Sequence, residues 1–431
     1  MAERFAAEVC IIGAGPVGGA LACRLATAGI STAVVDRAAL PPMEHPAFDG
    51  RAYAIAAGSR RLLQEAGVWD ALAEAACPIR DIRVSDGGLG RAASRLHLHF
   101  DHREAGDTTA AFGEMVEARS LRVALNARMH ALPALRVFAP ATAEVDRRDD
   151  GATIQIGGGS SVDCRLVVAA EGRNSPLRRS AGIPVTRLPY NQTGIVCAIS
   201  HQRPHHNTAL EHFLPSGPFA QLPMCASPDA LEGGAPNMSA IVWTERTTIA
   251  QRMLALDDAS LAKAIVRRLG DGLGALQVVG RRWSYPLGAL YAHRYHETRL
   301  VLVGDAAHTI HPIAGQGLNL GFRDAMALAD LVIEASGRGE DCGAPDLLRR
   351  YQRRRRPDNL LMLAATDALD RVFSNDNKLL RLARDVGIAA VDRVPPLKRL
   401  FMRQAMGLAS GRPDGGQELV DVAPQRLGLL R

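Results

Sequence analysis

The chain lacks the features of secreted and membrane-spanning proteins. None of its seven cysteines forms a CxxC pair, and they stand scattered at positions 10, 23, 77, 164, 197, 225 and 342. Such a set predicts reduced, intracellular thiols rather than a disulfide framework or a zinc site. The apolar run from Val9 follows Glu3 and Glu8 without the basic segment of a signal peptide. No apolar run approaches the roughly 20 residues of a membrane span, so we expect a soluble or peripheral protein.

Aromatic residues and an excess of charge are also scarce. Aromatics make up 4% of the chain, and 51 Lys and Arg against 45 Asp and Glu give a net charge of +6. No basic stripe with interleaved aromatics is present, so the composition does not favour nucleic-acid binding. The small positive excess suits an anionic cofactor or an anionic membrane surface. With 431 residues the chain exceeds one typical hydrophobic core, which predicts two domains.

The first forty residues carry the pattern of a βαβ unit. An apolar strand over residues 8–12 leads into the glycine loop GAGPVGG at 13–19, helical periodicity follows over 20–28, and a second strand over 31–35 ends at Asp36. This order is typical of dinucleotide binding. The alternative is a tight turn that only happens to be rich in glycine.

Each glycine of this fingerprint, and the acidic residue after it, has a physical role. Gly13 makes the turn, Gly15 leaves room for a pyrophosphate, and Gly18 lets the helix approach the strand. Asp36 would accept a hydrogen bond from a ribose hydroxyl. We therefore predict an adenine dinucleotide site at the start of the chain.

A second glycine loop lies in the stretch from Arg299 to Ala325, RLVLVGDAAHTIHPIAGQGLNLGFRDA. A short apolar strand meets Gly304 and Asp305, and a loop with Gly315 and Gly317 then leads into a helix. Because glycine has no Cβ and a helix N-terminus favours negative charge, backbone N–H groups here can approach an anionic or polar ligand closely.

The middle of the chain adds a third loop and a region of different character. The strand over residues 163–170 ends in AEGRNSPLR, where Glu171, Gly172 and Arg178 could gather a phosphate-bearing ligand. A helix capped by Ser175 is a compatible reading of the same residues. From residue 183 to about 290, alternating segments predict an antiparallel sheet that would cover a substrate.

Two groups of histidines invite a metal interpretation, and neither is favoured. His97, His99 and His102 have no carboxylate or cysteine at ligand spacing. Asp305, His308 and His311 recur every three residues, but the segment continues into Pro312 and the glycine loop, which does not suit one helical face. We predict no metal site.

Together these motifs carry a family resemblance over nearly the whole chain, from residue 9 to residue 408. GAGPVGG, AEGRNSPLR and VGDAAHTIHPIAGQGLNLGFRDA resemble the three motifs of FAD-dependent aromatic hydroxylases of the p-hydroxybenzoate hydroxylase superfamily. FDGRAYAIA, HFLPSGPFAQLPM and SYPLGALYAHRY resemble, more narrowly, the ubiquinone-biosynthesis hydroxylases of the UbiH/UbiF/VisC type. One departure stands out, because the middle motif of this family usually begins with Asp-Gly and here begins with Glu171-Gly172.

The resemblance implies an α/β fold, α+β overall. A Rossmann-like FAD-binding domain (residues 1–75, 106–181 and 282–345) would be interleaved with an antiparallel-sheet substrate-binding domain (76–105 and 182–281). A helical C-terminal region (346–412) and a tail (413–431) would follow.

The resemblance also assigns site residues. The implied cofactor-binding residues are Gly13, Ala14, Gly15, Pro16, Gly18, Asp36, Arg37, Arg51, Arg119, Gly304, Asp305, Gly315, Gly317, Leu318 and Asn319. Residues 315–319 would present N–H groups to the pyrimidine edge of the flavin. Glu171, Gly172 and Arg178 would contact a nicotinamide or phosphate, and the Glu171 departure bears on nicotinamide docking more than on flavin binding. No catalytic base is implied.

The implied activity is hydroxylation of the ring of a polyprenylated phenol in ubiquinone biosynthesis through a flavin C4a-hydroperoxide. FAD is the implied cofactor, O₂ the co-substrate, and NAD(P)H or a ferredoxin the electron donor. Two alternatives stay open, a weakly active FAD-bound scaffold in a biosynthetic assembly and another flavin oxidation, such as an epoxidase or prenyl reductase.

The C-terminal region predicts how the protein is located. Arg353 to Arg356 form a basic run closed by Pro357, and residues 378–412 interleave basic and apolar residues. Such a basic amphipathic segment suits an anionic leaflet, although a solvated helix face explains it equally well. The expected location is cytoplasmic, peripheral on the inner face of the membrane, with a biosynthetic assembly and a second copy of the chain as further partners.

Overall fold

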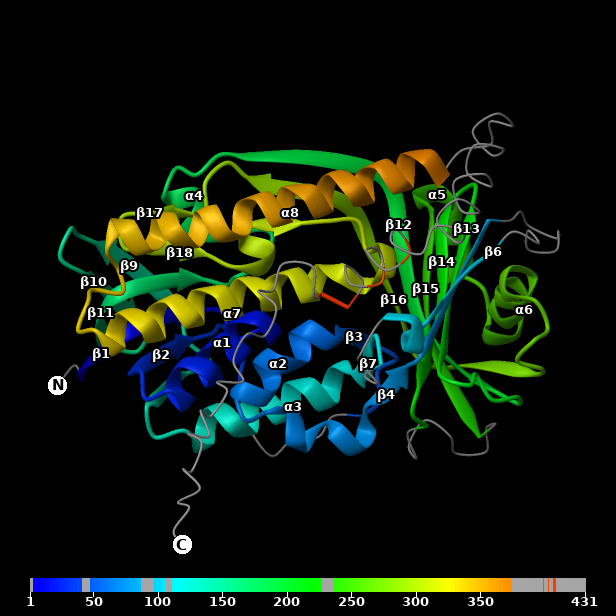
Figure 1. Cartoon of the computed structure of the whole chain (residues 1–431), viewed down its shortest axis with the longest axis horizontal. Coiled ribbons are helices and arrows are strands. Elements are labelled where there is room, and N and C mark those ends of the chain that lie inside the picture. Colours follow the sequence, from blue (N-terminus) through cyan, green and yellow to red (C-terminus); the bar gives the residue numbers. More distant parts are fainter. Residues whose placement is uncertain are drawn as a thin grey trace, which may run out of the picture.

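The structure is a computed structural model that describes residues 3–40, 47–86, 97–105, 111–226 and 236–373, together with residues 398, 402, 406 and 407. Its elements form three sheets with helices around them (Figure 1). Besides the strands and α-helices given below, short 3₁₀ turns span Trp69–Ala71, Ala73–Ala75, His102–Ala105, Gly304–Ala306 and Ile313–Gly315.

A largely parallel sheet forms one end of the molecule, with strand order β17-β18-β11-β1-β2-β8. β10 pairs with β11 and with β9. The strands are β1 (Arg4–Ile12), β2 (Thr32–Val35), β8 (Leu135–Phe138), β9 (Ala143–Arg147), β10 (Ala152–Ile156), β11 (Ser160–Ala169), β17 (His296–Glu297) and β18 (Leu300–Leu302). β1 runs parallel to β2 and β11, and β11 runs parallel to β18. Their carboxyl ends therefore meet at one edge of the sheet, where ligands bind in open α/β sheets.

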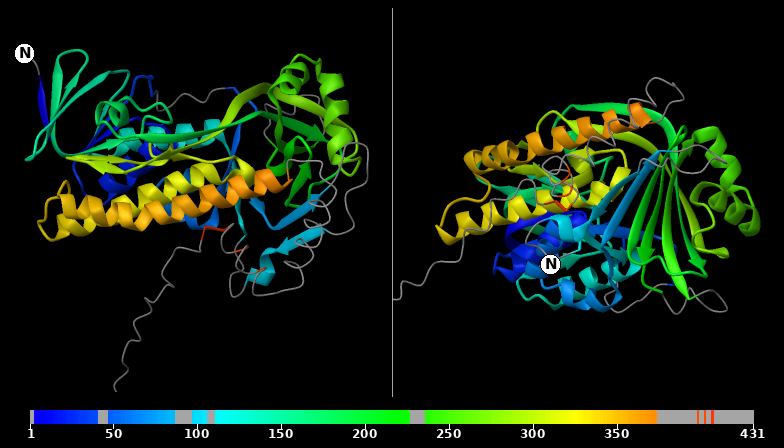
Figure 2. Two further views of the ribbon diagram at one scale, coloured as in Figure 1. Left: turned by 90° about the horizontal axis from the view of Figure 1, so that it is seen from above. Right: turned by 45° about the vertical axis from the view of Figure 1, so that its right-hand side comes forward.

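Helices cover this sheet. They are α1 (Pro16–Thr27), α2 (Ala57–Glu65), α3 (Ala118–Ala131), α4 (Pro176–Ser180), α7 (Gln316–Gly337) and α8 (Pro345–Phe373). α1 packs against both α3 and α7, which brings the start of the chain beside residues 300 positions later. α7 and α8 lie side by side along the length of the molecule in both orientations (Figures 1 and 2).

A large antiparallel sheet forms the other end, with strand order β19-β16-β12-β15-β14-β13-β5-β6. The strands are β5 (Asp81–Asp86), β6 (His97–Asp101), β12 (Val185–His201), β13 (Thr208–Leu214), β14 (Gly217–Met224), β15 (Asn237–Arg246), β16 (Leu276–Ala292) and β19 (His308–Thr309). Helices α5 (Thr247–Leu254) and α6 (Asp258–Leu269) cover its outer face, where Phe219 and Trp243 are buried. The inner face, with Phe213 and Met238, belongs to an apolar cluster that includes Ile313 of the second glycine loop.

The fold class predicted from the sequence is confirmed, since an α/β unit and an antiparallel sheet alternate along the chain. A small sheet of β3 (Ala52–Ala56), β7 (Gly113–Glu117) and β4 (Cys77–Ile79) lies between them. β4, from a segment predicted for the substrate domain, pairs here with β7, from a segment predicted for the FAD-binding domain. The exact division into domains stays a prediction.

Two local predictions are wrong. The sequence over residues 113–132 predicts a helix, but the first five residues form β7, because they pair with β3. The sequence over residues 137–145 predicts one strand-like run, which the structure divides between β8 and β9. Pro357, which follows the basic run in the sequence, lies inside α8. Nearly all of the predicted basic segment 378–412 and the whole tail 413–431 lie outside the described residues.

Candidate functional site

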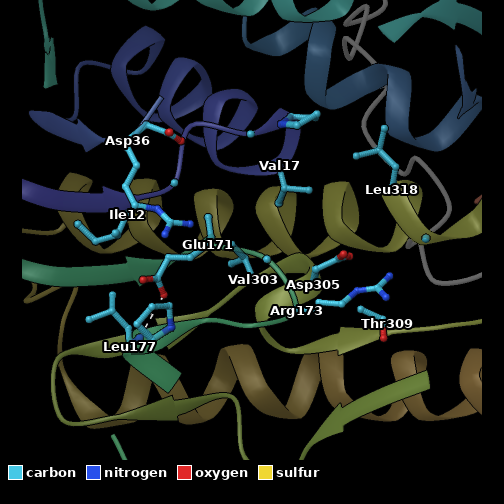
Figure 3. Close-up of a pocket in the computed structure, with 18 of the residues that line it drawn as sticks. Ile12, Val17, Asp36, Glu171, Arg173, Leu177, Val303, Asp305, Thr309 and Leu318 are labelled. Carbon is cyan, nitrogen blue, oxygen red and sulfur yellow. Dashed lines mark hydrogen bonds between the residues drawn. The ribbon is translucent and has the colours of Figure 1, made fainter. Parts of the chain in front are cut away.

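A cavity of about 1010 Å³ opens at the carboxyl edge of the parallel sheet. Its walls include Ile12, Gly13, Gly15, Pro16, Val17, Asp36, Arg37, Tyr53, Glu171, Gly172, Arg173, Asp305, Thr309, Gly315, Gly317 and Leu318. Side chains from these distant segments surround one space in Figure 3. The volume lies at the upper end of the roughly 300–1,000 Å³ usual for ligand pockets.

The first glycine loop is packed so closely that side chains are excluded. Gly13 has φ +107°, and a Cβ there would lie 2.5 Å from the carbonyl oxygen of Ala170. A Cβ on Gly18 would lie 2.0 Å from the carbonyl oxygen of Gly13. Gly15, by contrast, meets nothing within 4 Å and lines the cavity. Because Gly15 caps α1 without a side-chain hydrogen bond, the N–H groups of the helix start remain available for an anion.

Asp36 lies at the end of β2 and fixes the glycine loop. Its Oδ2 accepts a hydrogen bond from the backbone N–H of Ala14 at 2.6 Å, and its Oδ1 accepts from Ala38 N–H at 2.7 Å. Asp36 and Arg37 both line the cavity. The carboxylate therefore stands beside the helix N-terminus, as the fingerprint predicted.

Asp305 and Arg173 face the cavity from two different loops. In Figure 3 they lie near each other beside Thr309, and all three line the cavity. The protein around the cavity desolvates the Asp305 carboxyl and raises its pKa, while the charges of His308 and Arg173 oppose that rise. A carboxyl group and a guanidinium group from separate loops thus face the same cavity.

The second glycine loop is held in place by Asn319. Its Oδ1 accepts from Ala56 N–H at 2.9 Å, and its Nδ2 donates to the carbonyl oxygens of Ala54 at 2.9 Å and Gly315 at 3.1 Å. Gly315 has φ +64°, a conformation that favours glycine, and precedes the first residue of α7. Gly315, Gly317 and Leu318 therefore line the cavity on a segment that Asn319 joins to β3 by hydrogen bonds.

Gly304 is positioned by a buried network around Asp324 of α7. The Asp324 carboxylate accepts from Gly304 N–H at 3.1 Å, His308 Nε2 at 2.6 Å, Arg355 Nε at 2.8 Å and Asn359 Nδ2 at 3.1 Å. Burial opposes ionisation, but the charges of His308 and Arg355 outweigh it and hold the pKa of Asp324 well below its usual range.

The histidines of the second loop have protein partners. His308 is bound to Asp324 at 2.6 Å, and His311 lies 3.3 Å from Gln192 Oε1 and 3.6 Å from Asp370. Within the described part of the chain, no three His, Cys, Asp or Glu side chains gather as metal ligands would.

The loop after β11 places two of its three predicted residues, Glu171 and Gly172, in the cavity wall and the third, Arg178, behind it. Glu171 lines the cavity and accepts hydrogen bonds from Ser175 Oγ and Leu177 N–H, so it caps α4; burial raises its pKa. Arg178 is buried and donates to the carbonyl oxygens of Ala306 at 2.7 Å and Arg173 at 2.8 Å. The structure therefore gives Arg178 a positioning role, because both of its terminal nitrogens are bound to backbone.

Arg51 and Arg119 stand back from the described walls of the cavity. Arg51 pairs with Asp49 at 2.6 Å and stacks 4.2 Å above the Trp283 ring. Arg119 is buried and pairs with Glu117 at 2.6 Å. Their contacts with a cofactor stay predictions.

Some cavity residues were not singled out from the sequence. Tyr53 of β3 lines the cavity beside the second glycine loop, and Leu222 and Val242 line it from the antiparallel sheet. The alternation of apolar residues in β14 and β15 was visible in the sequence, but the face that meets the cavity was not.

The geometry fits FAD. The start of α1 offers an anion site, Asp36 offers an acceptor beside it, and the N-terminus of α7 lies at the far end of the same cavity. A molecule with a pyrophosphate in the middle and rings at both ends matches this arrangement.

Comparisons with known proteins agree with that fit. The family model for the FAD binding domain matches residues 6–365. The ubiquinone hydroxylase UbiL of Rhodospirillum rubrum is 48% identical over 409 residues, which cover 95% of this chain and 91% of that protein. The 3-demethoxyubiquinol 3-hydroxylase of Escherichia coli is 33% identical over 404 residues, covering 93% of this chain and 98% of that protein.

Solved structures show the same fold. The p-nitrophenol 4-monooxygenase PnpA of Pseudomonas putida DLL-E4 superposes with a TM-score of 0.74 at 18% identity, covering 95% of this chain and 100% of that one. PqsL of Pseudomonas aeruginosa gives a TM-score of 0.69 at 23% identity, covering 89% and 99%. The chain therefore belongs to the FAD-binding-domain family of flavoprotein monooxygenases and, within it, to the ubiquinone-biosynthesis hydroxylases.

Proposed function

We propose that this protein uses FAD and O₂ to hydroxylate the aromatic ring of a polyprenylated phenol in ubiquinone biosynthesis. The observation that carries the proposal is one cavity that begins at the first glycine loop, passes Gly315 and ends against the apolar Leu222 and Val242. Relatives named as ubiquinone hydroxylases match nearly the full length of the chain and support the substrate class.

The residues of this chain would bind and orient the reactants. The pyrophosphate would lie at the start of α1, the adenosine ribose at Asp36, and the flavin ring against the backbone of residues 315–319. Bound FAD supplies the activation of O₂, and the apolar wall on the antiparallel sheet keeps water from the reacting centre. Arg51 and Arg119 would act at longer range on the cofactor.

The electron donor would reach the flavin from the side of Arg173. We propose NAD(P)H or a ferredoxin as this donor. Arg173 would face it, because Glu171 is occupied in capping α4 and Arg173 is the basic residue of this loop that lines the cavity. Replacing Glu171 by Asp, the residue usual in the family, tests whether this position influences the reaction with the electron donor. If the rate of flavin reduction by NADH or NADPH changes by less than twofold, this position does not govern the donor.

The activity is tested with FAD-loaded protein and a prenylphenol under ¹⁸O₂. NADH, NADPH and a ferredoxin with its reductase are supplied in separate reactions. We expect a product that gains one ¹⁸O atom with at least one donor. Unlabelled phenol in all three reactions, with the FAD still bound, would overturn the proposal.

We also propose that α8 contacts the membrane surface. No helix in the described residues combines the length and apolar character needed to cross a membrane. Leu361 is 64% exposed, and Leu360 is also exposed, one to two turns after the exposed Arg353 and Arg354. Exposed leucines beside exposed arginines suit an anionic interface.

Co-sedimentation with vesicles tests this contact. We expect more protein to sediment with phosphatidylserine-containing vesicles than with neutral ones, and less when Leu361 is replaced by Ser. Equal binding of both proteins to both kinds of vesicle would refute a role for this face.

A further inference from the structure

The inner face of the antiparallel sheet carries an acidic side chain, Glu211, that has no partner among the residues that the structure describes. Glu211 of β13 is 9% exposed and lies between Ala209 and Phe213 on the same face of the strand, since alternate residues share a face. Both neighbours belong to the apolar cluster that faces the second glycine loop. The Glu211 carboxyl makes no hydrogen bond or ion pair with any residue that the structure describes.

Glu211 stands at the end of the cofactor cavity. A small extension of about 30 Å³, enough for roughly one water-sized group, is lined by Glu211 together with Leu222, Val242, Pro312 and Gly315. These four neighbours also line the main cavity. The carboxyl therefore lies just beyond the loop that is proposed to hold the flavin ring, where the substrate ring has to bind.

The surroundings of Glu211 are otherwise uncharged. Its described neighbours in the extension are Pro, Ala, Leu, Val, Thr and Gly, and its partner in β5 is Val84. Burial alone raises the pKa of Glu211 to about 7. The titratable group on the adjacent loop is His311, which contacts Gln192 and Asp370 and whose pKa burial lowers.

A purely structural role explains this arrangement poorly. An unpartnered buried carboxyl destabilises a fold unless something satisfies it. A general base works best when its pKa lies near the working pH and its carboxyl is within hydrogen-bond reach of the reacting proton. Glu211 lies beside the cavity, where a phenol bound against Leu222 and Val242 would face its carboxyl.

We propose that Glu211 is the general base that accepts the proton of the substrate's phenolic hydroxyl. The inference rests on the proposed function. A π electron pair of the ring forms the new C–O bond to an OH group derived from O₂; the O–O bond breaks, and the second oxygen atom leaves as hydroxide. At the same time the phenolic O–H bond breaks, its electron pair becomes the C=O bond of a dienone, and its proton forms an O–H bond on Glu211. The dienone then loses the proton of the hydroxylated carbon to the hydroxide, which becomes water, Glu211 returns its proton to the carbonyl oxygen, and the ring regains aromaticity.

An equilibrium experiment tests the recognition without turnover. FAD-loaded, oxidised protein without an electron donor is titrated with 2-prenylphenol and with its methyl ether between pH 5.5 and 8.5, and binding is followed by the flavin absorbance. In the wild type we expect the preference for the phenol over the ether to rise about tenfold with a midpoint near pH 7, because an ionised acceptor makes the stronger hydrogen bond. A preference that does not change with pH in the wild type would overturn the proposal, whatever the variants do.

Two variants sharpen the test. In Glu211→Gln we expect the preference to be independent of pH. Glu114→Gln is the matched control, because Glu114 is also a buried strand carboxyl with a raised pKa, but it pairs with Arg60 away from the described cavity walls. This control should titrate like the wild type.

Single-turnover hydroxylation separates this inference from the proposed function. We expect Glu211→Gln to lower the rate of oxygen transfer by a factor on the order of 10²–10⁴, the usual contribution of a general base, with FAD content unchanged. A variant that hydroxylates as fast as an active wild type would refute the role of Glu211 and leave the function intact. A wild type that shows the pH-dependent preference but never hydroxylates would refute the function and leave the recognition of the hydroxyl by Glu211.

Discussion

Two neighbouring glycines at the start of α1 face very different surroundings. A Cβ on Gly18 would lie 2.0 Å from the carbonyl oxygen of Gly13, whereas a Cβ on Gly19 would find its nearest neighbours at 3.5 Å and 3.6 Å. A distance of 2.0 Å is a steric clash, whereas 3.5 Å and 3.6 Å are ordinary van der Waals contacts. At the residue scale, therefore, only one of the two glycines is required by packing, although both belong to the same motif.

Gly18→Ala should lose FAD. The added methyl group has to push the loop away from the helix, which costs about 1–3 kcal/mol and opens the anion site. Gly19→Ala should keep FAD and gain up to about 1 kcal/mol from better helix propensity. The ratio of flavin to protein absorbance after gel filtration, together with the thermal midpoint, checks both. Equal FAD retention in the two variants would contradict the packing argument.

Glu211 also predicts how stability varies with pH. Its pKa is about 7 in the folded state and about 4.5 in the unfolded chain, so the folded state holds the proton more tightly. Stability should then fall as the pH rises from about 4.5 through 7, by up to roughly 3 kcal/mol. Glu211→Gln should be more stable than the wild type at pH 8 and similar to it at pH 4.5. Urea titrations at both pH values measure this, and a difference independent of pH would contradict it.

At the scale of elements, the two long helices are joined to the site through one buried carboxylate. Asp324 of α7 binds Gly304 at the end of β18, His308 of β19, and Arg355 and Asn359 of α8. The loop that carries Asp305 is thereby fixed to α7 and α8 together. Nothing in the local sequence around position 324 indicates these partners, since they lie up to 35 residues away.

Asp324→Asn should destabilise the protein by about 3–5 kcal/mol, because it breaks a fully buried ion pair and leaves Arg355 with only the less buried Asp358 as an acidic partner. Asp330→Asn is the control on the same helix. Asp330 pairs with Arg354 of α8 at 3.7 Å, but both side chains are about half exposed to solvent, so the loss should stay below about 1 kcal/mol. Urea denaturation compares the two variants, and similar losses would show that burial of the pair does not decide its effect.

Several elements were predictable from the sequence because their signals are local. The strand predicted over residues 8–12 and the helix predicted over 20–28 are confirmed as parts of β1 and α1, which begin earlier, at Arg4 and Pro16. The cap of α4 by Ser175 and the strands β12 to β15 likewise follow from turn chemistry and periodicity. The failures have non-local causes. β7 is a strand because β3 and β4 pair with it, and α8 continues through Pro357 because α7 supports it along its length.

At the scale of the whole molecule, the cavity exists only because separate segments converge. Residues near 15, 36, 172, 305 and 317 share its walls, although they span most of the chain. A ligand that contacts all of them therefore joins segments that lie far apart in the sequence. Binding should stabilise the fold as a unit rather than one loop alone.

Removing FAD should lower the thermal midpoint, and adding it back at about 100 times its dissociation constant should restore about 2.7 kcal/mol of stability. FMN serves as the control ligand, because it lacks the adenosine half that is proposed to reach Asp36. We expect FMN to restore less than FAD at the same free concentration, because FMN without the adenosine half should have the larger dissociation constant. Calorimetry on the stripped protein measures both, and equal recovery would argue against binding at Asp36.

By itself the sequence determined the dinucleotide fingerprint, the second glycine loop, the α/β class and the hydroxylase family, because these depend on residues close together in the chain. Only the tertiary structure decided that Arg178 is bound to backbone, that Asp324 holds Gly304 in place, and that Glu211 lies beside Gly315 at the edge of the cavity. Those roles depend on which distant side chains become neighbours and on how completely water is excluded. Neither can be read from the order of residues along the chain.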